Sequence, residues 1–364
     1  MSLLDFDGTM ATVDEDQPLA PDEASDDAAS STQSLTSSIL EYRKENGRTY
    51  HAYKDGKYSL PNDDMENERL DLQHELFRRT FDGRLGLAPP NDPNYEAEHV
   101  LDVGTGTGIW AIEYGDEHPE AKAKKSTPPG VALADMARSS VSTSLPTNRA
   151  GMSPSSVLFP YILTYDTRLP PNVEFLIDDI DEEWTYSAPF DYVHSRMMNS
   201  SVKDWRVYLE KCLQSLAPGG YVEVQEIDLN AKSDDGTLRE DSNLSRWLKL
   251  LGEATVLLGR PYQDIQQIQD IMAEVGFRDV TVKNFKWPTN PWPKDTKHKT
   301  LGQWHNANMS SAIEALTLAP FTRALGWSPA EVQAFLVDAR KDLNNRGIHA
   351  YWPIVSVYGR KPLS

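Results

Sequence analysis

The chain of 364 residues contains one cysteine and no long apolar run. A single cysteine excludes a disulfide framework and a zinc site built from cysteines. Cys212 lies in an apolar helical pattern, so we expect a buried structural thiol and an intracellular protein. No segment approaches the roughly 18–20 apolar residues of a membrane span, and the first residues lack the pattern of a secretory signal. We therefore expect neither membrane insertion nor export, and no histidine group has the spacing of a metal site.

Basic residues are also scarce, with 36 Lys and Arg against 55 Asp and Glu, which gives a net charge of −19. Roughly half of this excess lies before Tyr42, in a stretch without any Lys or Arg. Nucleic acid is therefore not expected as a partner, because it needs clustered basic side chains. Residues 1–38 also have few large apolar side chains and cannot offset chain entropy, which predicts a disordered acidic tail.

The central motif is Gly104-Thr105-Gly106-Thr107-Gly108, which lies between a predicted buried strand (99–103) and a predicted helix (109–114). Glycine lets the backbone turn sharply and approach a ligand, and the start of the helix offers free N–H groups. In an open α/β sheet, ligands bind at this carboxyl end of the strands. The pattern predicts a ligand site here, and a plain tight turn is the alternative.

The glycine spacing distinguishes two ligand classes. A dinucleotide site would place its third glycine at position 109, where Ile109 stands, so an oxidoreductase is disfavoured. The G-x-G-x-G spacing instead typifies binding of S-adenosylmethionine (SAM). Asp102 would then position the amino-acid end of SAM, next to the loop residues that approach it: Gly104, Thr105, Gly106 and Gly108.

Further strands alternate with helices, which indicates a mainly parallel sheet with helices on both faces. The strand at 173–177 ends at Asp179, which is expected to accept a hydrogen bond from the adenine amino group, with Ile180 against the ring. A solvated or helix-capping carboxylate is the alternative. The other predicted strands are 190–193, 221–227 (after a turn at 217–220), 280–285 and 352–358. The predicted helices include 41–47 (ended by Gly47), 205–216, 265–275, 299–316 and 329–344.

These motifs resemble class I SAM-dependent methyltransferases, and more closely the fungal methyltransferase family that includes the velvet-associated regulator of secondary metabolism. The resemblance is carried by the glycine loop and by residues 50–58, 69–74, 178–184 and 194–196. It implies a Rossmann-like seven-stranded sheet of order 3-2-1-4-5-7-6, SAM as cofactor, and a cytoplasmic or nuclear location. The implied organisation is an N-terminal cap and linker (39–95) and a methyltransferase domain (96–364) with a helical lid (286–345).

The chain departs from this family after its first helix, where residues 122–167 form an atypical insertion rich in Ser, Pro and Ala. The resemblance requires an acidic residue for the ribose hydroxyls at the end of the second strand. Asp135 and Asp166 are the candidates. Asp135 is favoured because a parallel crossover needs a dozen or more residues, and few separate Asp166 from the strand at 173.

Methyl transfer mainly requires alignment in a dry pocket, and a general base helps when the acceptor is a hydroxyl or an acid. The candidate bases are His194, Glu226 and His305; alternatively, Glu226 holds a helix end or pairs with Arg196. The aromatic stretch 287–293 with Trp304 predicts either an acceptor pocket or core packing. Residues expected to close the SAM site are Tyr50, Tyr58 and His74.

The acceptor is expected to be a small molecule or a protein, and no amino-base motif (Asn-Pro-Pro-Tyr) indicates nucleic-acid methylation. Fold and family do not settle the acceptor. The alternative function is a regulatory binding protein with weak or no turnover and a protein partner.

Overall fold

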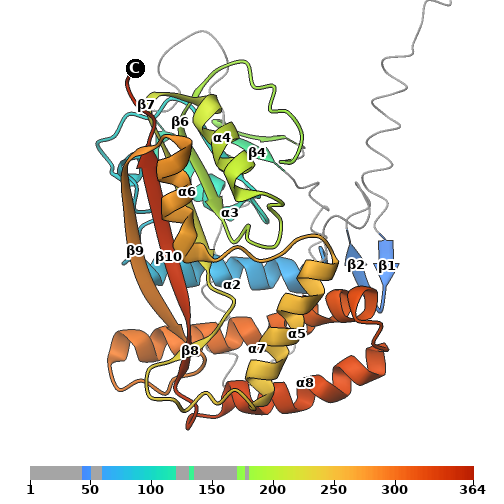
Figure 1. Ribbon diagram of the computed structural model, residues 1–364. Coiled ribbons are helices and arrows are strands. Elements are labelled where there is room, and N and C mark those ends of the chain that lie inside the picture. The colour runs from blue at the N-terminus through green and yellow to red at the C-terminus, as the bar shows by residue number, and fades with distance from the viewer. Residues whose placement is uncertain (1–42, 51–59, 120–130, 135–169, 177–179) are drawn as a thin grey trace, which may run out of the picture.

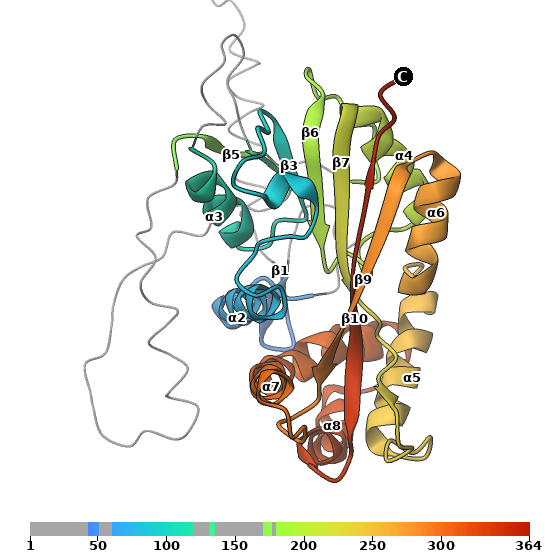
Figure 2. The ribbon, with the colours of Figure 1, turned by 90° about the vertical axis from the view of Figure 1, so that its left-hand side faces the viewer.

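A computed structural model describes residues 43–50, 60–119, 131–134, 170–176 and 180–364. The predicted acidic tail (1–38) lies outside the described residues, as do Tyr58, Asp135, Asp166 and Asp179, and most of the insertion. The described chain forms one large mixed sheet with helices on both faces and a further group of helices at one end of the sheet (Figure 1, Figure 2). This is the Rossmann-like α/β class that the sequence predicts.

The sheet has eight strands, and its central part is parallel. The order across it is β5 (Val173–Leu176), β4 (Val131–Ala134), β3 (Val100–Val103), β6 (Phe190–Arg196), β7 (Leu216–Ile227), β10 (Ala350–Arg360) and β8 (Lys232–Ser233). The eighth strand, β9 (Arg278–Pro288), pairs with β10 alone, and β10 is antiparallel to β7, β8 and β9.

Helices cover both faces of the parallel part of this sheet, and its central strand β3 is accordingly short and buried throughout. On one face, α3 (Ile109–Glu117) packs Trp110 and Tyr114 against Tyr192 of β6. On the other face lie α4 (Trp205–Ser215) and α6 (Ile268–Val275), where Cys212 is fully buried and free, as predicted (Figure 2). Gly276 ends α6 in the left-handed conformation, and the short helices η1 (Pro89–Asn91) and η5 (Ile265–Gln267) complete the connections.

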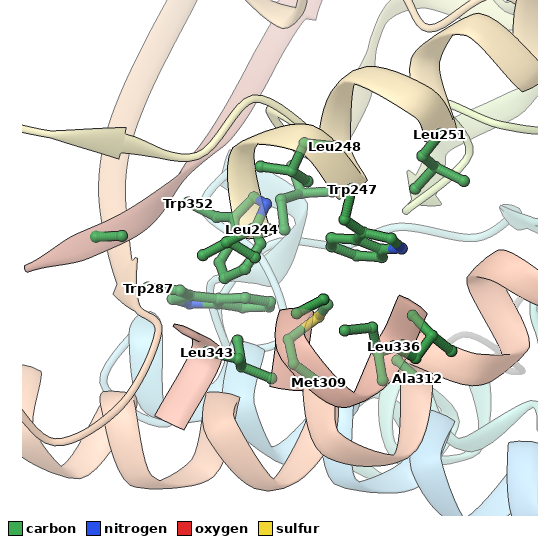
Figure 3. Close-up of a cluster of buried hydrophobic side chains, with 14 of the residues drawn as sticks. Leu244, Trp247, Leu248, Leu251, Trp287, Met309, Ala312, Leu336, Leu343 and Trp352 are labelled. Atoms are coloured by element: carbon green, nitrogen blue, oxygen red, sulfur yellow. The ribbon is translucent and has the colours of Figure 1, made fainter. Parts of the chain in front are cut away.

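A separate hydrophobic core lies beyond the carboxyl ends of the parallel strands. It is formed by α2 (Asp64–Thr80), α5 (Asn243–Leu257), α7 (Thr296–Ala324) and α8 (Pro329–Asn344), with the adjoining ends of β9 and β10. Figure 3 shows Trp287 and Trp352 among the leucines of this core. None of the helices that the structure describes is both long and apolar enough to cross a membrane.

Two local predictions are wrong. The predicted helix at 41–47 is instead a hairpin of β1 (Arg43–Glu45) and β2 (Arg48–Tyr50), because Asn46 and Gly47 both take positive φ, at 52° and 82°. Two consecutive residues of this kind make a hairpin turn rather than a helix end. The turn predicted at 217–220 lies inside β7, although Gly219 keeps a positive φ of 84°.

The aromatic stretch at 287–293 packs into the core, the second of its two predicted roles. Trp287 is fully buried, and its indole N–H donates to Thr80 Oγ1 at 2.8 Å. Trp304 lies under the Arg79 guanidinium, 4.2 Å from the ring centroid. These rings therefore attach β9 and α7 to α2.

Gly302 sets how closely α7 approaches the chain that follows β9. A Cβ atom at this position would lie 2.3 Å from the carbonyl oxygen of Asn290, whereas a Cβ at Gly252 of α5 meets nothing within 4 Å. We expect Gly302→Ala to lower the free energy of unfolding by about 1–3 kcal/mol through overpacking. The matched Gly252→Ala variant should be neutral or more stable by up to about 1 kcal/mol, because alanine favours helix. Thermal midpoints measure both, and equal midpoints for the two variants would contradict this packing argument.

Candidate functional site

The glycine loop joins β3 to α3 with three glycines in the left-handed region. Gly104, Gly106 and Gly108 have φ of 70°, 58° and 80°. A Cβ atom on Gly104 would lie 2.1 Å from Met198 Sδ, so a side chain there would have to displace the flexible Met198 side chain and also adopt a positive φ. Gly108 is the N-cap of α3 and provides no side-chain cap. The loop thus leaves its backbone and the first turn of α3 free to face a ligand.

A cavity of about 240 Å³ lies at this edge of the sheet. It is bounded by the glycine loop, by the ends of β6 and β7, and by α2, α5 and α7. The sequence-predicted residues that line it are Asp102, Gly104, Thr105, Gly106, Ile180, His194, Arg196, Glu226 and His305. One cavity therefore brings together most of the predicted site residues that the structure describes.

Asp102 and His194 meet because β3 and β6 pair in parallel with these two residues opposite each other. His194 Nδ1 lies 2.7 Å from Asp102 Oδ1, and the imidazole stacks on Trp110 at 3.8 Å between centroids. Since the Asp102 carboxylate can only accept, Nδ1 of His194 donates the proton in this bond. His194 thus fixes the orientation of the acidic side chain beneath the glycine loop.

Several buried polar atoms around the loop have no hydrogen-bond partner. They include Asp102 Oδ2, Thr105 Oγ1 and His194 Nε2. An unpaired buried polar atom costs about 1–3 kcal/mol, so such atoms usually await a ligand or an ordered water. A carboxylate oxygen below a glycine turn suits the amino group of SAM, and the residues present therefore fit this cofactor.

A chain of hydrogen bonds links α2 to the ends of β6 and α3. Arg196 Nη2 donates to His74 Nδ1 at 2.9 Å, and His74 Nε2 lies 2.9 Å from Glu113 Oε2. Because Arg196 is only a donor, His74 must carry its proton on Nε2, and burial lowers the pKa of His74 to about 4. Thr107 also donates to Asp71 Oδ1 at 2.6 Å. These bonds hold α2 over the glycine loop.

Glu226 is the second-last residue of β7, and its side chain is fully buried. Its Oε1 accepts the backbone N–H of Met198, and its Oε2 has no partner. Burial raises the pKa of Glu226 to about 8. The predicted pairing of Glu226 with Arg196 is wrong, because Arg196 turns to His74 instead. Rather than a helix end, Glu226 holds the loop that follows β6.

That loop begins with a residue in an uncommon backbone conformation. Met197 has φ of 57°, and its N–H donates to Gln225 O at 2.9 Å. A bulky residue in the left-handed region is a local strain that the surrounding structure must maintain. Met197 and the next four residues, through Ser201, all line the cavity. The strained residue therefore directs this segment along the site.

The remaining predicted site residues differ in whether they reach the cavity. Ile180 is partly buried and lines the cavity, whereas the adjacent Asp179 lies outside the described residues. Strand β4 ends at Ala134, which pairs with Val103 of β3. The predicted ribose-binding residue Asp135 follows directly in the sequence. Tyr50 packs beneath the Arg323 guanidinium, 4.9 Å from its ring, and is not one of the cavity-lining residues.

Sequence reasoning missed an aromatic and apolar part of the cavity. Trp247 of α5 and Trp352 of β10 line it, together with one face of α7. The signal was present in α7, where the lining residues recur at helical spacing: His305, Asn308, Met309, Ala312 and Leu316.

Comparison with known proteins identifies the family. A model of the methyltransferase domain family matches residues 72–282. The chain is 36% identical over 336 residues to methyltransferase pytC of Aspergillus terreus, covering 92% of this chain and 93% of that protein. It is 32% identical to the secondary metabolism regulator laeA of Aspergillus fumigatus, covering 88% and 77%. It is 31% identical to the protein-methionine methyltransferase laeA of Emericella nidulans, covering 89% and 77%.

The glycine loop, the unpaired acidic oxygen beneath it and these relatives lead to one assignment, with SAM as the cofactor. The chain belongs to the methyltransferase domain family, as a SAM-dependent methyltransferase related to fungal proteins of secondary metabolism.

Proposed function

We propose that this methyltransferase methylates a hydroxyl group, with Glu226 as the general base. The observation that carries the proposal is the unpartnered Oε2 of Glu226, which is buried in the same cavity as the glycine loop. Methylation of a hydroxyl releases a proton, and Glu226 with a pKa of about 8 accepts it in its ionised form, whose share grows as the pH rises towards 8.

The proposed cofactor contacts follow the strand ends. Asp102 binds the amino group of SAM, with Thr105 and the backbone of Gly104, Gly106 and Gly108 around the amino-acid end. Asp135 binds the ribose, because it follows the strand that pairs with β3. Asp179 binds the adenine amino group and Ile180 packs on the ring, which is supported by the position of Ile180 in the cavity wall.

The proposed core is a seven-stranded sheet of order 3-2-1-4-5-7-6, formed by β5, β4, β3, β6, β7, β10 and β9, with β8 as an addition. In this arrangement α2 is the N-terminal cap, and α7 with α8 forms the C-terminal helical insertion. This order puts the ends of β3 and β6 side by side, where the cofactor and the acceptor must meet.

Bound SAM supplies an electrophilic methyl group, and the protein contributes alignment and proton transfer. His194 is a positioning residue, since its Nδ1 hydrogen bond holds Asp102. Glu226 is itself held through Oε1 by the backbone of Met198, which leaves Oε2 to take the acceptor proton.

A methionine acceptor is the alternative, because one relative is named a protein-methionine methyltransferase. Methylation of a thioether releases no proton and needs no base. The environment of Glu226 therefore favours a hydroxyl acceptor for this chain. A regulatory protein partner is supported by the relatives named as regulators, and a cytoplasmic or nuclear location stays a prediction.

Cofactor binding is tested by calorimetric titration with SAM. We expect Asp102→Ala to weaken binding about tenfold or more, because a hydrogen bond to a charged group contributes about 1.5–3 kcal/mol. The control is Asp116→Ala, which removes an exposed acid at the far end of α3. Equal affinities for the two variants would remove Asp102 from the cofactor site.

The buried state of Glu226 is tested by stability against pH. Its pKa rises from an ordinary 4.5 to about 8 on folding, so within this window the folded state retains a proton that the unfolded state has lost. The contribution of Glu226 is therefore fully present below pH 4.5 and is lost as the pH rises through 8. Glu226→Gln cannot titrate, so we expect its thermal midpoint to gain on that of the original chain between about pH 5 and 8. A midpoint difference that is constant across this range would show an ordinary, solvated carboxylate.

Acceptor class is tested by measuring S-adenosylhomocysteine (SAH) release with a panel of hydroxylated aromatic molecules and methionine-containing peptides. We expect turnover with a hydroxyl acceptor, and a loss of about 100-fold or more in Glu226→Gln. The control variant Glu117→Gln changes a half-exposed acid on α3. Turnover with the peptides alone, unaffected by Glu226→Gln, would reject the hydroxyl proposal.

A further inference from the structure

The cavity has a second part that the glycine loop does not reach. Its walls are Trp247 and Leu248 of α5, Met309 and Ala312 of α7, and Trp352 of β10, and we call this part the acceptor chamber. Each of these side chains is less than a tenth exposed. Figure 3 shows the α5 and β10 side chains facing those of α7 across the helical core. Apolar walls of this kind bury the body of a small ligand and fix it through few polar groups.

Beside these apolar walls lies His305, a polar side chain that has no hydrogen-bond partner. It is fully buried, and neither Nδ1 nor Nε2 makes a hydrogen bond. The rings of Trp287 and Trp352 flank it, with centroids 5.2 and 5.0 Å away. Leaving an imidazole unpaired in a core is costly, and His305 lines the cavity, so a ligand group can recover this cost.

The charge state of His305 restricts the ligand. Burial, together with the positive charge of Arg69, lowers the pKa of His305 to about 3. The imidazole is therefore neutral and presents one donor and one acceptor. Arg69 itself is compensated, because it bonds Glu66 at 2.7 and 2.9 Å and Asn308 at 3.0 Å. Consequently, neither His305 nor Arg69 offers the chamber an unpaired charge that would balance an ionised ligand.

We propose that the acceptor chamber binds the methyl acceptor as a small, uncharged, mainly aromatic molecule with a hydroxyl or carbonyl group hydrogen-bonded to His305. The inference rests on the proposed function, since it places the acceptor beside Glu226 in the same cavity. It adds the substrate class and a specificity-determining residue. A protein acceptor fits less well, because the walls are buried side chains from three separate elements rather than an exposed groove.

The test uses the full chain saturated with SAH and two probes of similar shape, 2-naphthol and 2-methylnaphthalene. Calorimetric or saturation-transfer titration should show 2-naphthol binding about tenfold more tightly, which is the preference that one buried hydrogen bond supplies. In His305→Leu the two probes should bind within about twofold of each other, and His305→Gln should restore part of the preference.

A second variant tests the chamber without altering His305. Ala312→Phe fills the space between α5 and α7, so both probes should bind about tenfold more weakly or worse, because the added ring displaces them. The affinity for SAH should stay within about twofold in every variant, and thermal midpoints establish that each one folds. These readouts do not depend on turnover.

The outcomes separate the two proposals. Failure of the original chain to bind SAH overturns the proposed function. Normal SAH binding with no binding of 2-naphthol overturns the chamber inference alone. A hydroxyl preference that survives in His305→Leu, or binding of 2-naphthol that survives in Ala312→Phe, also overturns it, because the probe then binds elsewhere.

Discussion

The parallel pairing of β3 with β6 is the constraint on which the site depends. It places Asp102 opposite His194, and both side chains of their 2.7 Å hydrogen bond are buried. A one-residue shift in register would turn the side chains of the shifted strand to the other face of the sheet, and this pair could not form. The stack of His194 on Trp110 then connects this pair to α3, and so to the glycine loop at its start.

Several features that lower the stability of the folded protein lie around one cavity. Met197 is held at a positive φ, Glu226 is buried with a raised pKa, and His305 has two unpaired nitrogens. Each lowers the stability of the folded protein, and the large hydrophobic core of α2, α5, α7 and α8 offsets them. Their convergence is expected where a protein retains strain and desolvation for binding and proton transfer.

The predictions succeeded where the signal was local. The glycine loop followed from spacing and from the strand before it, and Cys212 was expected to be buried from the apolar pattern around it. They failed where one sequence pattern is compatible with two different structures. Gly47 suggested a helix end, but Asn46 also takes a positive φ, and the pair makes a hairpin. The aromatic stretch after β9 allowed two roles, and contact with Thr80, far away in sequence, selects packing for Trp287.

By itself, the sequence determined the alternation of strands and helices in the central sheet, the loop that approaches the cofactor and the family, because these depend on residues that are neighbours in the chain. Only the tertiary structure decided which distant side chains share a space. Arg196 bonds His74 rather than Glu226, because α2 packs over the end of β6. Trp247, His305 and Trp352 meet around one chamber, because α5, α7 and β10 come together from separate parts of the chain. Such contacts arise from packing geometry, and a one-dimensional pattern does not specify them.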